Sequence, residues 1–235
     1  MHIAVLVTNT DETDFAQKYP KDGEKFSILI KEVRPSWEIS IFSVKDDVFP
    51  SDITTFDGVL ITGSPASVYD DWQWIPRLLD QIRVAYCANV PMFGACFGHQ
   101  AIAVALGGKV TPNPDGWAFG LLEMQMESRP PWYDGPVALL QYGAHIEQVT
   151  QLPDGAEVVF STHGCPVAGL VIADRVYTTQ NHPEMTPEFV TALLAEYVEK
   201  LGEVVATRAK NSLERIADRD VFVRSIARFF ERNPV

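Results

Sequence analysis

The chain has 235 residues, of which 46% are hydrophobic and 21% charged, and its formal net charge is −12. This composition supplies enough apolar side chains for a sizeable core, so it excludes disordered and fibrous classes. The acidic surplus repels phosphate backbones, which excludes nucleic-acid binding through a general basic surface.

The first half of the chain alternates short apolar strands with amphipathic helices. Strands are predicted at residues 3–8, 38–44, 58–62 and 90–95, because each is a short apolar or alternating run that ends in turn residues. Helices are predicted at 22–33, 71–86 and 98–106, where apolar residues recur at helical spacing. This order predicts an α/β fold: a flavodoxin-like, open, mostly parallel sheet with helices on both faces.

In the second half, short strands are separated by Gly, Pro and Asp, at 121–126, 137–140, 157–161, 170–173 and 175–179. The last two meet at the hairpin-like turn Ala173-Asp174, so we expect an antiparallel extension of the sheet. Apolar stripes predict C-terminal helices at 188–201 and 221–230, with a polar, mobile excursion at 206–219 between them. We therefore expect one domain over residues 1–200 and a helical extension, 201–235, packed on it.

The sequence contains no pattern that predicts a targeting segment, a membrane span or a metal site. The N-terminal segment has no cationic region or cleavage site, and no apolar stretch reaches the ~18 residues of a membrane span, so we expect no membrane association. The three cysteines, Cys87, Cys96 and Cys165, cannot all pair internally, which favours the reducing cytoplasm. His2, His99 and His163 have no partners at metal-ligand spacing, so we expect no metal site. We also expect that no organic cofactor is needed.

The sharpest local feature is the sequence G-A-C-F-G-H-Q at residues 94–100, which follows a predicted buried strand and opens a helix. The glycines on both sides of Cys96 permit a tight bend that presents the cysteine in a strained conformation. A helix N-terminus favours thiolate over thiol, and the N–H of Phe97 can face a developing oxyanion. The alternative is that Cys96 is a small buried residue before a helix.

A second motif, His182-Pro183-Glu184, follows the last predicted strand. A thiolate nucleophile needs a base, and the base needs an orienting group. Because His182 and Glu184 are two residues apart, the carboxylate can reach the imidazole and fix its tautomer. The alternative is a simple helix start, with Pro at the first position and an acid in the first turn.

Together with L-I-T-G-S-P at residues 60–65, these two motifs resemble the class I glutamine amidotransferases of the Cys-His-Glu type. The three blocks lie in the order found in that family, and the resemblance covers about residues 1–200. It is strongest to stand-alone members similar to the glutaminase domain of GMP synthase.

The resemblance implies a role for each matching residue. Cys96 would attack the γ-carboxamide carbon of glutamine, His182 would accept and later return a proton, and Glu184 would orient His182. The oxyanion hole would combine the amide of Phe97 with a backbone amide from Gly63 or Ser64.

For substrate binding, the resemblance implies that Gln100 helps to hold bound glutamine. His145 lies in Ala144-His145-Ile146-Glu147, where the family has Ser-His-x-Asp, and is predicted as a second substrate contact.

Three functions remain open at this stage. The first is hydrolysis of the γ-amide of glutamine through a cysteinyl thioester, which releases glutamate and ammonia. Because the sequence contains no synthetase domain or Walker-type loop, ammonia delivery would need a separate synthetase subunit. The second is a γ-glutamyl peptidase or hydrolase acting on other γ-glutamyl amides or peptides. The third is a catalytically silent binding or redox-sensing module that kept the fold.

Overall fold

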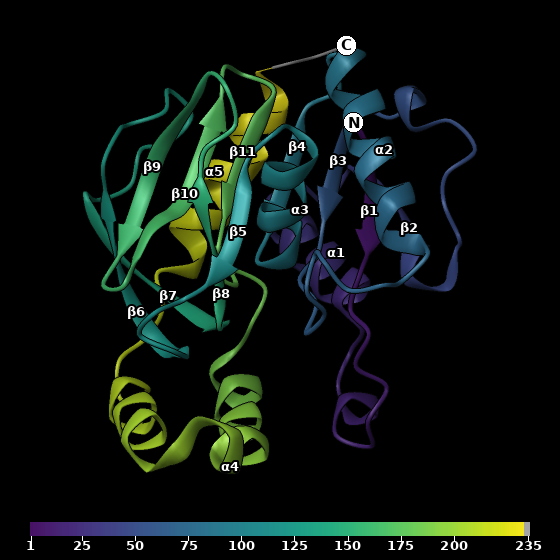
Figure 1. Ribbon diagram of the computed structural model, residues 1–235. Coiled ribbons are helices and arrows are strands. Elements are labelled where there is room, and N and C mark those ends of the chain that lie inside the picture. Colours follow the sequence, from purple (N-terminus) through teal and green to yellow (C-terminus); the bar gives the residue numbers. More distant parts are fainter. Residues whose placement is uncertain (233–235) are drawn as a thin grey trace.

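Five parallel strands followed by four antiparallel ones form the central sheet of residues 1–232, the part of the chain described by the computed structural model (Figure 1). In spatial order they are β2 (Glu38–Ser43), β1 (His2–Val7), β3 (Gly58–Ile61), β4 (Met92–Ala95), β11 (Val176–Thr179), β10 (Cys165–Ile172), β9 (Ala156–Thr162), β6 (Ala118–Met126) and β7 (Ala138–His145). Two further strands, β5 (Lys109–Pro112) and β8 (Glu147–Gln151), pair with each other outside this sheet.

Helices cover both faces of the sheet. The longer ones are α1 (Asp22–Val33), α2 (Trp74–Cys87), α3 (Phe97–Ala105), α4 (Pro187–Ser212) and α5 (Arg219–Glu231), and single 3-10 turns are η1 (Ala16–Lys18), η2 (Val44–Asp46) and η3 (Ile53–Thr55). Helices α1 and α5 share one hydrophobic cluster with the sheet, and α2 and α3 share the other. Helix α4 lies beyond the end of the strands, at the bottom of Figure 1. None of the helices formed by residues 1–232 has the length and hydrophobicity that a membrane crossing requires.

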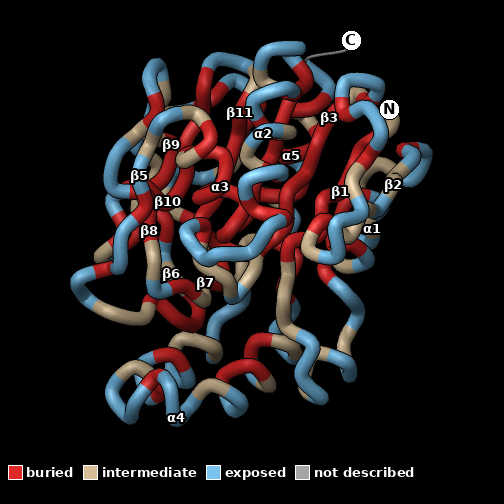
Figure 2. Tube along the Cα trace, turned by 45° about the vertical axis from the view of Figure 1, so that its right-hand side comes forward, coloured by how far each residue is buried: buried red, intermediate tan, exposed pale blue. Residues whose placement is uncertain are grey.

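The alternation of side chains along the strands explains the two clusters. In β1, Ile3 and Val5 point to the side of α1 and α5, whereas Ala4 and Leu6 point to the side of α2 and α3. The central strands are buried on both faces, as the buried colour at the centre of Figure 2 shows. Continuous apolar runs are therefore required there, and the prediction of a mostly parallel, two-sided α/β sheet is confirmed.

The antiparallel extension is also present. Strands β10 and β11 form a hairpin in which Ile172 pairs with Val176, and Ala173 at its turn has a φ of 49°. Strands β9, β6 and β7 continue the sheet with antiparallel pairing.

The C-terminal segment differs from the sequence prediction in one respect. The expected mobile excursion over residues 206–219 is wrong, because residues 206–212 continue α4 as its second arm. Gly202, with φ 73° and ψ 162°, interrupts the helix and separates a first arm (187–201) from this second arm (203–212). Ala209 on the second arm is completely buried against β6, so the arm is held by packing.

The proposed division between a domain at 1–200 and an extension at 201–235 falls inside α4. Beyond it, α5 contributes Phe222, Phe229 and Phe230 to the cluster under the sheet, and all three are fully buried. The last three residues of the proposed extension, 233–235, lie outside the described residues.

Candidate active site

The turn between β4 and α3 presents Cys96 in a strained backbone conformation. Its φ is 50° and its ψ is −106°, a region that costs a residue with a side chain of order 1–3 kcal/mol. No residue larger than glycine fits at position 98 in this turn, because a Cβ on Gly98 would lie 2.3 Å from the carbonyl oxygen of Ile61. Two backbone hydrogen bonds fix the turn, from Cys96 N to Thr179 O (2.8 Å) and from Gly98 N to Thr62 O (3.0 Å). The turn is thus fastened to the ends of β3 and β11.

His182 follows β11 and is held from two sides. Its backbone N–H donates to Tyr142 O (2.8 Å) on β7, and its ring Nδ1 lies 2.7 Å from Glu184 Oε1. Both side chains of this pair are almost completely buried, at 7% and 2% exposure. The other ring nitrogen, Nε2, is buried and makes no hydrogen bond within the described residues, so it can exchange a proton with a neighbouring group.

Cys96 and His182 meet above Gly63. A Cβ built on Gly63 would lie 2.9 Å from His182 Cε1 and 3.4 Å from Cys96 Cβ, so only a glycine lets the imidazole and the thiol approach this backbone. The structure therefore brings together, from the segments after β4 and β11, the three residues that the sequence predicted as nucleophile, base and orienting carboxylate.

The charges at this point favour a protonated imidazole. Burial opposes the charged form of His182, but the Glu184 carboxylate and Cys96 outweigh burial and raise the pKa of His182 well above its ordinary value of 6.5. Such a coupling is typical of a base that lies between an orienting carboxylate and a nucleophile.

The loop after β3 is oriented by a second set of hydrogen bonds. The hydroxyl of Thr8 lies 3.0 Å from the carbonyl oxygen of Gly63, which points that carbonyl into the protein. In a trans peptide the following N–H points the opposite way, so the amide of Ser64 points away from Thr8. Gly63 and Ser64 line the same cleft as Cys96. The amide of Phe97, the first residue of α3, is one of those that a helix leaves without an intrahelical partner.

The two predicted substrate contacts, Gln100 and His145, do not line this cleft in the structure. Gln100 Nε2 donates to Glu147 O (3.0 Å) and to Gln180 Oε1 (3.1 Å), so both of its N–H groups are used. His145 Nδ1 lies 3.0 Å from the same Glu147 carbonyl, and burial lowers the pKa of His145 to about 4. Gln100 and His145 therefore meet at the backbone carbonyl of Glu147, the first residue of β8.

The cleft itself measures about 230 Å³. Its floor, a name used below for the residues from the strand ends, consists of Gly63, Ser64, Cys96, His182 and Glu184. The opposite side, called the α4 wall, consists of residues from the first arm of α4: Phe189, Leu193, Tyr197 and Lys200. The apolar stripe of this helix was predicted from the sequence, but its place at the cleft was not. The available signal was the change along the stripe from apolar residues to Tyr197 and Lys200.

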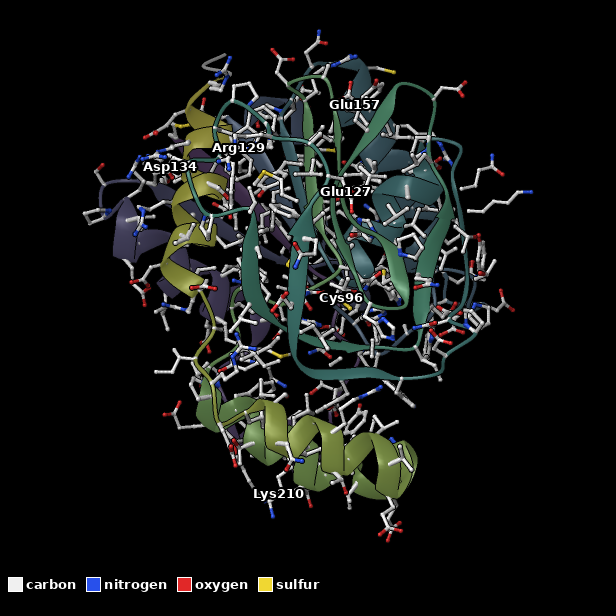
Figure 3. The ribbon with its side chains drawn as sticks, turned by 90° about the vertical axis from the view of Figure 1, so that its left-hand side faces the viewer. Cys96, Glu127, Arg129, Asp134, Glu157 and Lys210 are labelled. Atoms are coloured by element: carbon white, nitrogen blue, oxygen red, sulfur yellow. The ribbon has the colours of Figure 1, made fainter. Side chains whose placement is uncertain are left out.

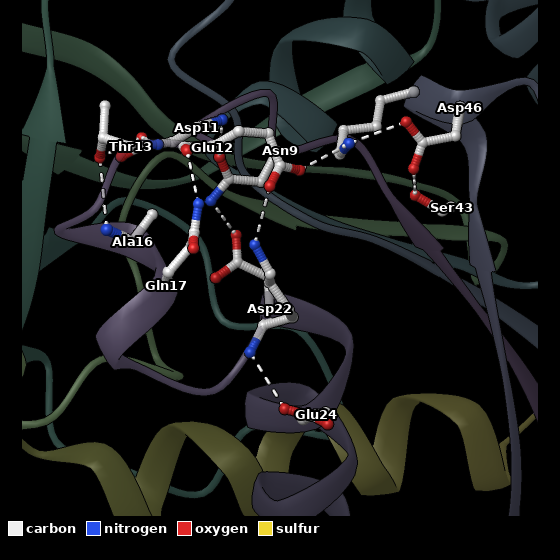
Figure 4. Close-up of polar contacts among 12 residues, drawn as sticks. Asn9, Asp11, Glu12, Thr13, Ala16, Gln17, Asp22, Glu24, Ser43 and Asp46 are labelled. Carbon is white, nitrogen blue, oxygen red and sulfur yellow. Dashed lines mark hydrogen bonds and ion pairs between the residues drawn. The ribbon is translucent and has the colours of Figure 1, made fainter.

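The loop after β1 and the start of α1 line a third side of the cleft, which was not predicted. Figure 4 shows polar contacts that join this loop to the start of α1. Asn9 Nδ2 donates to Asp22 Oδ2 (2.7 Å), and Lys25 Nζ lies 2.9 Å from Asp22 Oδ1. Lys25 Nζ also lies 3.8 Å from the ring centroid of Phe189, so the ion pair ties α1 to the α4 wall.

The other cysteines lie away from the cleft. Cys165 is buried in β10, and burial raises the pKa of its thiol to about 12, which makes it a poor nucleophile. Cys87, at the end of α2, is exposed.

Comparisons with known proteins bear on this arrangement. A family model described as glutamine amidotransferase class-I matches residues 29–201. Gamma-glutamyl peptidase 3 of Arabidopsis thaliana is 27% identical, over 89% of this chain and 88% of the relative. GMP synthase [glutamine-hydrolyzing] of Acinetobacter baylyi is 32% identical over 84% of this chain, which spans only 36% of that longer protein. A crystal structure of a glutamine amidotransferase from Thermotoga maritima superimposes with a TM-score of 0.76 at 15% identity, over 98% of each chain.

Proposed function

Because this chain belongs to the class-I glutamine amidotransferase family, we propose that it hydrolyses the γ-amide of glutamine to glutamate and ammonia. The observation that carries this proposal is the convergence of Cys96 and the buried His182–Glu184 pair on one cleft. An amide is a poor electrophile, so its cleavage needs an activated nucleophile and preorganised donors in the same place.

In the first half of the reaction, the Cys96 thiolate attacks the γ-carbonyl carbon. The imidazolium of His182, which its neighbours keep protonated, gives its proton to the amide nitrogen as the C–N bond breaks. The products of this half are ammonia and a γ-glutamyl thioester on Cys96.

In the second half, neutral His182 accepts a proton from water, and the resulting hydroxide attacks the thioester carbon. Glutamate leaves, and the sulfur departs as the thiolate beside the imidazolium that has just formed. Glu184 keeps Nδ1 protonated in both halves, so that Nε2 is the nitrogen that exchanges the proton. We assign the stabilisation of the tetrahedral oxyanion to the amides of Phe97 and Ser64, with the Gly63 peptide held in place by Thr8.

A second candidate is hydrolysis of γ-glutamyl peptides by the same groups, with an amine in place of ammonia. The full-length match to the Arabidopsis γ-glutamyl peptidase favours it, because the two chains cover almost 90% of each other. If glutamine is the substrate in the cell and its ammonia is used, the acceptor would be a separate synthetase subunit.

The test is a product assay on glutamine and a panel of γ-glutamyl amides and peptides, with Cys96→Ser as the matched control. We expect glutamate release from at least one compound, no release by the variant, and a γ-glutamyl adduct on Cys96 in the mass spectrum of the acid-quenched protein. If neither turnover nor labelling of Cys96 by a glutamine-mimicking electrophile occurs, the proposal fails and a silent binding or redox module is the better description.

A further inference from the structure

The β5–β8 ribbon lies outside the large sheet, and none of the described residues that line the catalytic cleft belongs to it. Val110 of β5 and Val149 of β8 are almost completely buried, and both belong to the hydrophobic cluster that α3 shares with the sheet. The ribbon also packs directly against α3. It is therefore fixed on the helix that begins immediately after the nucleophile.

Glu147, the first residue of β8, joins the ribbon to α3 through its main chain. Its carbonyl oxygen accepts a hydrogen bond from Gln100 Nε2 (3.0 Å). The backbone N–H of Gln100 in turn donates to the carbonyl oxygen of Cys96 (3.1 Å), so Gln100 lies one helical turn from the nucleophile. The main chain of Glu147 is thus held at a defined place relative to Cys96.

The side chain of Glu147 reaches a second segment, the loop 62–73 between β3 and α2. Its carboxylate oxygen Oε1 accepts from the hydroxyl of Ser67 in this loop (3.1 Å). Ser67 Oγ itself accepts from Tyr69 N (3.3 Å), so its own proton is left for the carboxylate. Ser67 follows Ser64 by three residues, and Ser64 supplies one of the amides assigned above to the oxyanion.

A second contact fastens the same loop to the ribbon. The N–H of Val110 donates to the hydroxyl of Tyr69 (3.2 Å), two residues beyond Ser67. Val68, between them, is buried in the cluster that α2 and α3 share. Apolar packing sets how close the loop lies but is non-directional, whereas the two hydrogen bonds fix how the loop is turned.

From these contacts we propose that Glu147 is a positioning residue for the oxyanion. It ties the loop that carries Ser64 to the helix that follows Cys96, so that the amide of Ser64 and the sulfur of Cys96 keep their spacing while the C–N bond breaks. The inference rests on the function proposed above and adds a residue to the reaction. The link to Ser67 is one part-buried hydrogen bond to a carboxylate, which corresponds to about a threefold to thirtyfold effect on kcat.

The experiment removes this link from each side. Glu147→Leu loses the acceptor but keeps the main-chain contact to Gln100, and Ser67→Ala loses the donor. We expect each change to lower kcat by about threefold to thirtyfold on whichever γ-glutamyl compound the wild-type protein cleaves. The double variant should lose no more than either single variant, because both changes remove the same bond. Glu147→Gln, which keeps an acceptor oxygen, should restore kcat to within about twofold of the wild-type value.

Alkylation of Cys96 by iodoacetamide distinguishes a displaced loop from a damaged nucleophile. In this reaction the thiolate displaces iodide at a saturated carbon, so a C–S bond forms, a C–I bond breaks and no oxyanion develops. The rate of alkylation would be followed by mass spectrometry of the peptide that contains Cys96. It should be unchanged in Glu147→Leu and in Ser67→Ala, although both variants turn over more slowly.

The matched control is Glu127→Leu. Glu127, the residue after β6, accepts a hydrogen bond from the hydroxyl of Ser161, so its contact is of the same kind as that of Glu147. It lies well apart from Cys96 (Figure 3). Glu127→Leu should therefore keep the wild-type kcat.

Four results would overturn the inference while hydrolysis by the wild-type protein stands. They are an unchanged kcat in Glu147→Leu, additive losses in the double variant, a loss of Cys96 alkylation in parallel with kcat, and an equal loss of kcat in Glu127→Leu. If the wild-type protein cleaves no γ-glutamyl compound, glutamine included, the proposed function fails and the inference falls with it.

Discussion

The floor of the catalytic cleft and the α4 wall face each other, but they are held in place by different means. The floor is fixed by backbone hydrogen bonds between strand ends, and its reacting side chains are buried. The α4 wall consists of side chains from a single helix, which is interrupted at Gly202. These side chains become more exposed along the helix, from Leu193 to Lys200. Bond cleavage needs sub-ångström alignment, whereas selecting a substrate tolerates looser contacts. The comparison therefore suggests that chemistry and specificity reside in separate parts of this cleft.

The largest expected effect is the loss of activity when the catalytic residues of the floor are replaced, compared with a replacement on the α4 wall. Replacing the nucleophile or the base, in Cys96→Ser or His182→Gln, should reduce kcat by about 10³–10⁶-fold, because members of a catalytic unit fail together. The matched change on the α4 wall, Tyr197→Phe, should alter kcat by less than about tenfold. Steady-state kinetics on whichever γ-glutamyl substrate the wild-type protein cleaves would compare them, and equal losses would show that the two regions are not separable.

The orienting carboxylate should give the next largest effect. Glu184→Gln should lower kcat by about 10²–10⁴-fold, because the imidazole loses its fixed tautomer. Since the Glu184 carboxylate and Cys96 both raise the pKa of His182, that pKa should fall in Cys96→Ser and fall further in the double variant. Titration of the His182 ring by NMR would measure both shifts, and a pKa that does not move would contradict the coupling.

The same coupling has a defined effect on stability. Because the pKa of His182 is raised by folding, the contribution of its ion pair is complete below the unfolded value near 6.5 and is lost as the pH rises through the folded value. The difference in free energy of unfolding between the wild-type protein and Glu184→Gln should therefore shrink on raising the pH through that range.

The floor and the helix that carries the α4 wall also differ in the space around a glycine, at Gly98 and Gly202. Gly98→Ala should destabilise the protein by about 3 kcal/mol or more and reduce kcat, because the new Cβ would collide with the carbonyl of Ile61. Gly202→Ala meets no atom within 4 Å, so only its positive φ opposes the change, at about 1–3 kcal/mol. Denaturant unfolding together with steady-state kinetics would distinguish the two variants. If Gly98→Ala changed neither the free energy of unfolding nor kcat, the backbone of the turn at Cys96 would have to relax to accommodate the new Cβ.

The most gradual effect, spread over several pH units, is expected from the histidines behind the floor. Burial lowers the pKa of His99 to about 3 and that of His145 to about 4, so both stay neutral in the folded protein. Below pH 6.5 the unfolded chain binds protons that the folded one does not, and stability should fall by up to about 1.4 kcal/mol per pH unit for each group. His145→Gln should flatten this dependence between pH 6.5 and 4.5.

Sequence patterns predicted the floor better than the wall. The turn at Cys96 and the His182–Glu184 pair are local motifs, because neighbours in sequence set their geometry. The pair β5 and β8 was not foreseen, since its strands are only four and five residues long and are separated by two longer strands. The hydrogen-bond partners of Gln100 could not be predicted for a related reason: Glu147 and Gln180 are distant from it in sequence, so only the fold shows these contacts.

The bond from His182 N to Tyr142 O has a consequence for how the protein would fail under stress. Tyr142 belongs to β7, which is the last strand of the large sheet and has a neighbouring strand on one side only. On its other side β7 bonds to His182 through Tyr142 and to Asp218 through Leu140. Edge strands open more readily than central ones, and hydrogen exchange reports such local opening. Fraying of β7 would release the histidine while the interior sheet stays intact, so warming should extinguish catalysis before the circular-dichroism signal of the fold declines.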